Sequence, residues 1–150
     1  MQVKELVKQY LDQIKIMQLA TSVNNQPWVI TVHYYSDEDS NLYWISTLAR
    51  KHSQDIEQNP KVAATILVHE NTPDENYVIG VSAEGTAELI REKVVEGVVQ
   101  GYARKHGKDS DMSDIASGKN PHKFYRLKPS RIVLFDNKNF PNDPRQELIL

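Results

Sequence analysis

The chain has 150 residues, the size of one ordinary domain, and its 39% hydrophobic and 25% charged residues are typical of a folded globular protein. Its net charge of −2 lacks the basic excess of a general nucleic-acid binder, and the absence of cysteine excludes disulfides, thiolate metal sites and cysteine nucleophiles. The N-terminus is charged and amphipathic and no apolar stretch is long enough to span a membrane, so we expect a cytoplasmic protein without membrane or nucleic-acid partners.

The first predicted element is an amphipathic helix over residues 2–16. Its apolar side chains recur at spacings of three and four residues, and they are Val3, Leu6, Val7, Tyr10, Leu11 and Ile14. Lysine and aspartate occupy the other face. We expect the apolar stripe to be buried against the rest of the domain.

A three-stranded antiparallel meander is predicted next. Alternating or β-branched and aromatic residues indicate strands at 17–23, 28–35 and 42–45. Polar turns at 24–27 and 36–41 separate them, and neither turn is long enough to hold a crossover helix. The strands therefore pair as neighbours rather than as a parallel α/β sheet.

A short helix from about Ala49 to Gln58 follows, and Asn59-Pro60 ends it. The strand 62–68 is almost continuously apolar, so we expect both of its faces to be covered. After a loop at 71–76, a long strand over 77–89 carries Gly80 and Gly85, which are typical of bends or bulges.

The second half of the chain is predicted to hold a helix over 89–105, packed closely through Gly97 and Gly101. A polar loop at 109–120 leads to a last strand over 124–135, broken by Pro129, and the tail 137–150 is predicted to be irregular. Together these elements indicate a single domain over 1–150, mainly β with a few helices, built as a small antiparallel barrel or sandwich.

The segment from Ser46 to Lys51 is the best candidate for a binding site. A strand ends there in two hydroxyls, Ser46 and Thr47, and a helix begins close to two cations, Arg50 and Lys51. Cations at a helix N-terminus oppose the helix dipole, whereas the free N–H groups there favour an anion. The pattern predicts a phosphate site, although a plain N-cap with solvated cations would produce the same residues.

Other chemistries find less support in the sequence. The five histidines show no metal-ligand spacing, so no metal site is predicted. The segment 80–85 has only a superficial likeness to a nucleophile elbow, and no Gly-rich phosphate loop occurs. We nominate no catalytic acid or base.

The ordered set of elements from Met17 to about Leu89 resembles the FMN-binding split β-barrel family of pyridoxamine 5'-phosphate oxidase. The shared pattern is two strands around a turn near Pro27, a third strand ending in Ser46, a basic pair, a short helix and Asn59-Pro60 before an apolar strand. The resemblance implies a split β-barrel with Greek-key-like antiparallel strands. It further implies that FMN is held by Thr31, Val32, His33, Ile45, Ser46, Thr47, Arg50 and Lys51.

The resemblance also implies a homodimer with flavin sites shared between subunits. The tail lacks the arginine- and histidine-bearing motif of the oxidase, so vitamin B6 is not the expected substrate. We expect an FMN-dependent oxidoreductase, a reductase or oxidase acting on a small molecule. The alternatives are a non-catalytic protein that stores or senses FMN, and a haem- or deazaflavin-binding relative on the same barrel.

Overall fold

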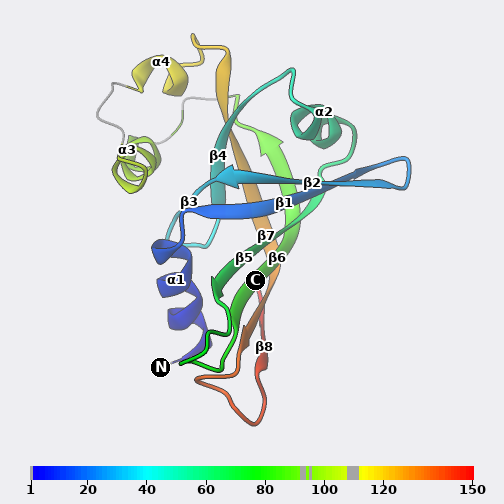
Figure 1. Ribbon diagram of the computed structural model, residues 1–150. Coiled ribbons are helices and arrows are strands. Elements are labelled where there is room, and N and C mark those ends of the chain that lie inside the picture. Colours follow the sequence, from blue (N-terminus) through cyan, green and yellow to red (C-terminus); the bar gives the residue numbers. More distant parts are fainter. Residues whose placement is uncertain (1, 92–93, 95, 108–111) are drawn as a thin grey trace.

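The computed structural model describes residues 2–91, 94, 96–107 and 112–150. One antiparallel sheet has the strand order β2-β1-β5-β6-β7-β4-β3, with β8 paired to β7, and it curls into a half-barrel (Figure 1). The predicted fold class, a mainly β split barrel, is confirmed. The element bounds are α1 Val3–Gln13, β1 Ile16–Val23, β2 Gln26–His33, β3 Tyr35–Ser36, β4 Leu42–Thr47, α2 Lys51–Gln58, β5 Lys61–His69, β6 Ile79–Leu89, α3 Glu96–Lys105, α4 Ser113–Ala116, β7 His122–Asp136 and β8 Arg145–Ile149.

Helix α1 buries the predicted stripe. Leu6, Val7, Tyr10 and Leu11 are all buried in the main core. The helix ends at Gln13, earlier than the predicted 16, because Ile14 is already in an extended conformation and β1 begins at Ile16. No helix within the described ranges is both long enough and apolar enough to cross a membrane.

The hairpin of β1 and β2 projects from the barrel beneath α2 (Figure 1). Its turn is tighter than predicted, because only Asn24 and Asn25 form it, with φ values of 52° and 63°. Two consecutive positive φ angles are the requirement of a two-residue hairpin turn, and asparagine tolerates them. Pro27 therefore lies inside β2, which is possible because β2 is at the edge of the sheet.

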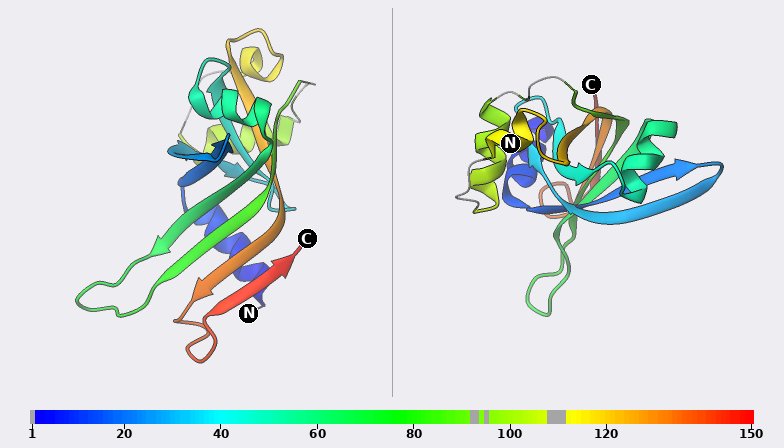
Figure 2. Two further views of the ribbon diagram at one scale, coloured as in Figure 1. Left: turned by 90° about the vertical axis from the view of Figure 1, so that its right-hand side faces the viewer. Right: turned by 90° about the horizontal axis from the view of Figure 1, so that it is seen from above.

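Strand β5 corrects the prediction that both of its faces are covered. Its residues alternate, with Val62, Ala64 and Ile66 buried and the side chains between them exposed; Leu67 is 54% exposed. Apolar composition alone does not reveal whether the second face has a partner. Figure 2 shows this face as part of the curled sheet of β5, β6, β7 and β8.

Strand β7 corrects two further predictions. Pro129 does not break it, because the register shifts at Glu84/Gly85 of β6 and the strand continues to Asp136. Gly85 is needed at this bulge, since a Cβ there would lie 2.1 Å from the carbonyl oxygen of Lys128. The tail is not irregular, because β8 pairs with the end of β7.

Of the helix predicted over 89–105, the structure shows α3 over Glu96–Lys105, while Leu89 belongs to β6 and residues 92, 93 and 95 lie outside the described part. Gly101 packs closely as predicted, since an added Cβ would lie 2.4 Å from the Tyr35 ring, but Gly97 has no atom within 4 Å. The predicted loop 109–120 contains α4, and its residues 109–111 lie outside the described part. A second core cluster packs α3 against the outer side of β4 and β7.

Candidate functional site

The corner where β4 turns into α2, from Ser46 to Ser53, is the candidate site. Strand β4 is fixed by pairing with β7, which places Ser46 opposite Lys123 and Thr47 opposite His122. The Arg50 N–H donates to the Thr47 carbonyl at 3.3 Å and closes the turn. Arg50 is the N-cap residue of α2 with no side-chain cap, and the first turn holds no acidic residue. This helix start thus presents uncapped N–H groups and cations, as the sequence predicted.

The two cations of the corner differ in their surroundings. The Arg50 side chain is exposed and has no hydrogen bond or ion pair with any residue that the structure describes. The Lys51 Nζ lies 3.1 Å from both carboxylate oxygens of Asp55 and 5.4 Å from the centre of the Trp28 ring. Asp55 is buried and also accepts a hydrogen bond from Thr21 Oγ1 at 2.8 Å. Lys51 is therefore tied to β1 and β2, while Arg50 remains available for a ligand.

The two hydroxyls at the end of β4 point to opposite sides, because side chains alternate along a strand. Ser46 is buried, accepts a hydrogen bond from Ser53 Oγ at 3.1 Å and donates to the Thr47 carbonyl at 3.3 Å. Thr47 is half-buried, and its hydroxyl makes no hydrogen bond to any described residue. Ile45 is half-buried against the second core cluster.

The predicted residues of β2 lie farther from the corner. Trp28, at the start of the strand, is joined to the corner through Lys51. Thr31 is exposed and accepts a hydrogen bond from Gln18 at 3.4 Å, while Val32 packs against the core. His33 ends the strand and stacks on His106, with ring centres 4.8 Å apart.

One buried residue of the corner was missed by sequence reasoning. His52 is only 4% exposed, and neither of its ring nitrogens has a hydrogen-bond partner among the described residues. Burial, and then the nearby charge of Arg50, lower its pKa below the ordinary value. The one signal in the sequence is that His52 and Asp55, three residues apart, can share a face of the predicted short helix. Within the described ranges, no group of three or more potential ligands is placed to hold a metal ion.

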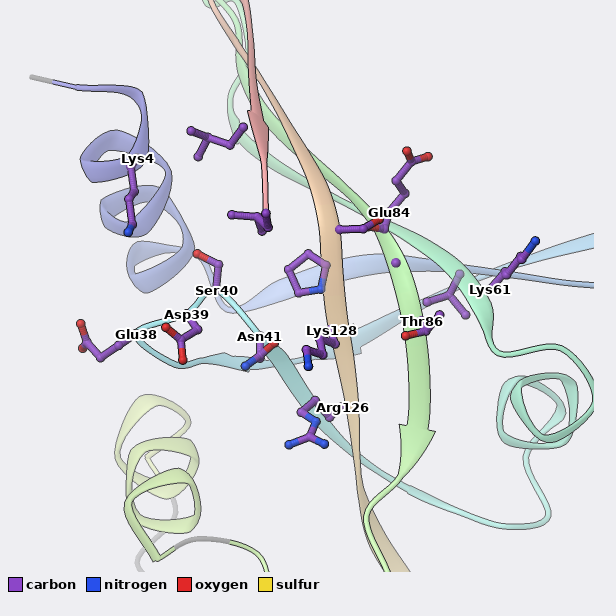
Figure 3. Close-up of a pocket in the computed structure, with 16 residues that line it drawn as sticks. Lys4, Glu38, Asp39, Ser40, Asn41, Lys61, Glu84, Thr86, Arg126 and Lys128 are labelled. Atoms are coloured by element: carbon purple, nitrogen blue, oxygen red, sulfur yellow. The ribbon is translucent and has the colours of Figure 1, made fainter.

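The structure has one hollow next to the corner and a larger one away from it. One of about 500 Å³ adjoins the corner and is lined by Leu48, Ser53, Ile56 and Tyr125 among others. A larger one of about 890 Å³ lies between the start of α1, the turn at 38–41 and the strands β6 and β7, where Arg126 and Lys128 line it (Figure 3). None of the predicted cofactor residues lines either hollow, but Ser53 of the corner lines the smaller one.

An open face of the sheet adjoins these residues. Pairing across the strands aligns Thr31, Gln18, Thr65, Ser82 and Val133 in one row. Leu67 and Phe135 lie on the same face and are 54% and 41% exposed. Large apolar side chains exposed next to one another are typical of a surface that another molecule covers.

Comparison with known proteins connects the fold to one family. The family model described as pyridoxamine 5'-phosphate oxidase matches residues 3–136. No curated protein matches the sequence significantly.

Solved structures share the fold at low sequence identity. A Listeria innocua protein described as a candidate pyridoxamine 5'-phosphate oxidase has a TM-score of 0.66 at 15% identity, over 89% of this chain and 98% of that chain. A FAD-binding protein from Mesorhizobium loti has a TM-score of 0.63 at 22% identity, over 88% of this chain and 90% of that chain. A heme-binding protein from Mycobacterium smegmatis has a TM-score of 0.69 at 14% identity, over 99% of this chain and 58% of that chain. At these identities the likeness shows a common fold alone.

Proposed function

This chain belongs to the pyridoxamine 5'-phosphate oxidase family, and from that premise we propose that it is a flavoprotein that binds FMN through its phosphate at the β4–α2 corner. The observation that carries the proposal is the start of α2, where Arg50 is exposed, uncapped and without an ion pair to any described residue. A phosphate placed there would meet backbone N–H groups and a guanidinium, which is the arrangement that binds phosphate in many proteins. It would also remove the penalty of cations at a helix start.

The residues of the corner would have separate tasks. Arg50 would grip the phosphate, and Thr47 offers an unused hydroxyl beside it. Lys51 would contribute a weaker attraction, because Asp55 already neutralises part of its charge. Ser46 would support the corner through its bond to Ser53 rather than reach the ligand. Thr31, Val32, His33 and Ile45 remain predicted contacts of the flavin ring and ribityl chain.

The proposed reaction class is a flavin-dependent oxidation or reduction of a small molecule. Bound FMN would supply the hydride or electron transfer, and the protein would bind and orient it. We further propose that two copies of the chain pair through the open sheet face that contains Thr65, Leu67 and Phe135, which would cover this surface. Sedimentation at micromolar concentration should then show a dimer, and a monomer that binds FMN stoichiometrically would contradict a shared site.

A flavin titration followed by fluorescence tests the phosphate assignment. Arg50→Ala should weaken FMN binding by roughly 1.5–3 kcal/mol, the value of a charge-assisted hydrogen bond. Lys51→Ala should weaken it less, and its melting temperature is needed as a check because Asp55 would lose its buried ion pair. Riboflavin, which lacks the phosphate, should bind weakly and respond to neither substitution.

Arg104→Ala is the matched control, because Arg104 is exposed on α3 and has no ion pair with a described residue. Equal FMN binding by Arg50→Ala and the parent would place the phosphate elsewhere. A visible spectrum of the purified protein separates the rivals, because flavin gives paired bands in the blue and near ultraviolet whereas haem gives a Soret band.

A further inference from the structure

His52 is a buried group that the proposed binding of phosphate does not yet use. Its imidazole is 4% exposed, and both ring nitrogens lack a partner among the described residues. A buried polar group without a hydrogen bond costs about 1–3 kcal/mol, so its presence calls for an explanation. The neighbouring polar side chains do not share this condition, since Asp55 and Ser53 are both bonded.

The position of His52 connects it to the ligand site. It lies in the first turn of α2, two residues after Arg50, and its side chain is on the buried side of the helix between Asp55 and Ile56. Helix N–H groups and the helix dipole act most strongly on groups in this turn. Any charge bound at Arg50 therefore acts on His52 as well.

Two charged groups of α2, Arg50 and Asp55, act on His52. Arg50 disfavours a proton on the imidazole, and Asp55 favours one. Lys51 reduces the effect of Asp55, because its Nζ lies 3.1 Å from both carboxylate oxygens. Without a ligand, burial and Arg50 outweigh Asp55, so the pKa of His52 lies below its ordinary value.

We propose that His52 takes up a proton when the phosphate of FMN binds at Arg50, so that this residue couples flavin affinity to pH; the inference rests on the proposed function. A phosphate dianion offsets the charge of Arg50 and lowers the cost of a second cation beside it.

The sign of the effect follows from linkage. A residue that gains a proton on binding makes binding tighter as the pH falls through the range between its free and bound pKa values. The phosphate of FMN has the opposite effect, because its second pKa is about 6 and the dianion is the better ligand. The contribution of His52 to proton uptake is therefore measured as the difference between the parent and a variant that lacks this histidine.

The experiment is calorimetric titration with FMN at about pH 6.5, in two buffers of different ionisation enthalpy, which gives the number of protons taken up. The parent should take up more protons than His52→Gln, by up to about one per site. His69→Gln is the control, because His69 ends β5 away from the corner, is bonded to the Tyr77 carbonyl and is paired with Glu75, and it should match the parent.

Equal proton uptake by the parent and His52→Gln, with FMN bound by both, would overturn this inference and leave the proposed function standing. Absence of FMN binding by the parent would overturn both. If His52→Gln fails to fold, the parent carries the test alone: NMR titration of its histidine ring protons should show one histidine whose pKa rises when FMN is added. No such histidine would equally overturn the inference.

Discussion

Two buried polar clusters at opposite ends of the fold contrast in how completely their hydrogen bonds are made. At the β7–β8 turn, Asp136 is fully buried and accepts hydrogen bonds from Tyr10 Oη at 2.8 Å, from Asn139 Nδ2 at 2.7 Å, and from two backbone N–H groups of the turn. At the start of α2, His52 is equally buried and has no partner among the described residues. Figure 1 shows the turn between β7 and β8 at the bottom of the barrel and α2 near its top.

The difference separates a structural cluster from a candidate ligand site. The Asp136 cluster (Tyr10, Asp136 and Asn139) closes on itself, and its bonds join α1 to the end of the sheet. Burial, and then the bond to Asp136, raise the pKa of the Tyr10 hydroxyl well above its ordinary value, so it remains a donor. At the start of α2, the two ring nitrogens of His52 are buried without a hydrogen bond to any described residue, and proteins tolerate this mainly where function requires it.

The largest expected effect is that of Asp136→Ala. Four donors would lose a buried acceptor, so the free energy of unfolding should fall by at least about 3 kcal/mol. Chemical denaturation measures this, with Asp143→Ala as an exposed control expected to stay within about 0.5 kcal/mol of the parent. A loss below about 1 kcal/mol, the value of one ordinary hydrogen bond, would remove the contrast between the clusters.

Tyr10→Phe should cost less, about 1–2 kcal/mol, because Asn139 would still donate to the carboxylate. The matched control is Tyr77→Phe, which removes the hydroxyl that donates to Glu75 at an exposed position. That control should change thermal stability little. Equal melting temperatures for the two variants would show that burial of the Tyr10 bond contributes nothing.

His52→Leu should have a smaller effect of the opposite sign on the flavin-free protein. Replacing an unsatisfied polar group with an apolar one of similar size is expected to be neutral or to stabilise by up to about 1 kcal/mol. The free energy of unfolding in denaturant checks this. A loss of about 2 kcal/mol or more would mean that His52 makes a favourable polar interaction in the free protein.

The smallest effect concerns pH. Burial, and then the charge of Arg50, lower the pKa of His52. Burial and the neighbouring His33 lower the pKa of His106. The unfolded chain therefore binds more protons at these two imidazoles than the folded protein does. The free energy of unfolding of the flavin-free protein should fall as the pH drops below about 6.5. His52→Leu should show a shallower fall. An identical pH dependence of the melting temperature would contradict the assignment to His52.

The sequence alone was sufficient for elements whose pattern is local. The stripe of α1, the alternation of β1 and the stop at Asn59-Pro60 each depend on spacing within a few residues, and each is found in the structure. The basic pair at a helix start is likewise visible in the sequence, as is the need for glycine at Gly101. Whether the predicted cofactor residues hold FMN stays a prediction.

Tertiary structure decided what depends on residues distant in the chain. Strand β8 forms by pairing with β7, and one face of β5 is open because none of the described elements covers it. The pairing of Lys51 with Asp55 is a local possibility, but Thr21 on β1 and Trp28 on β2 fix the surroundings that hold it. The missing hydrogen bonds of His52 also depend on tertiary structure. The helix α2 packs against β1 and β6, His52 is buried, and burial makes a missing hydrogen bond costly.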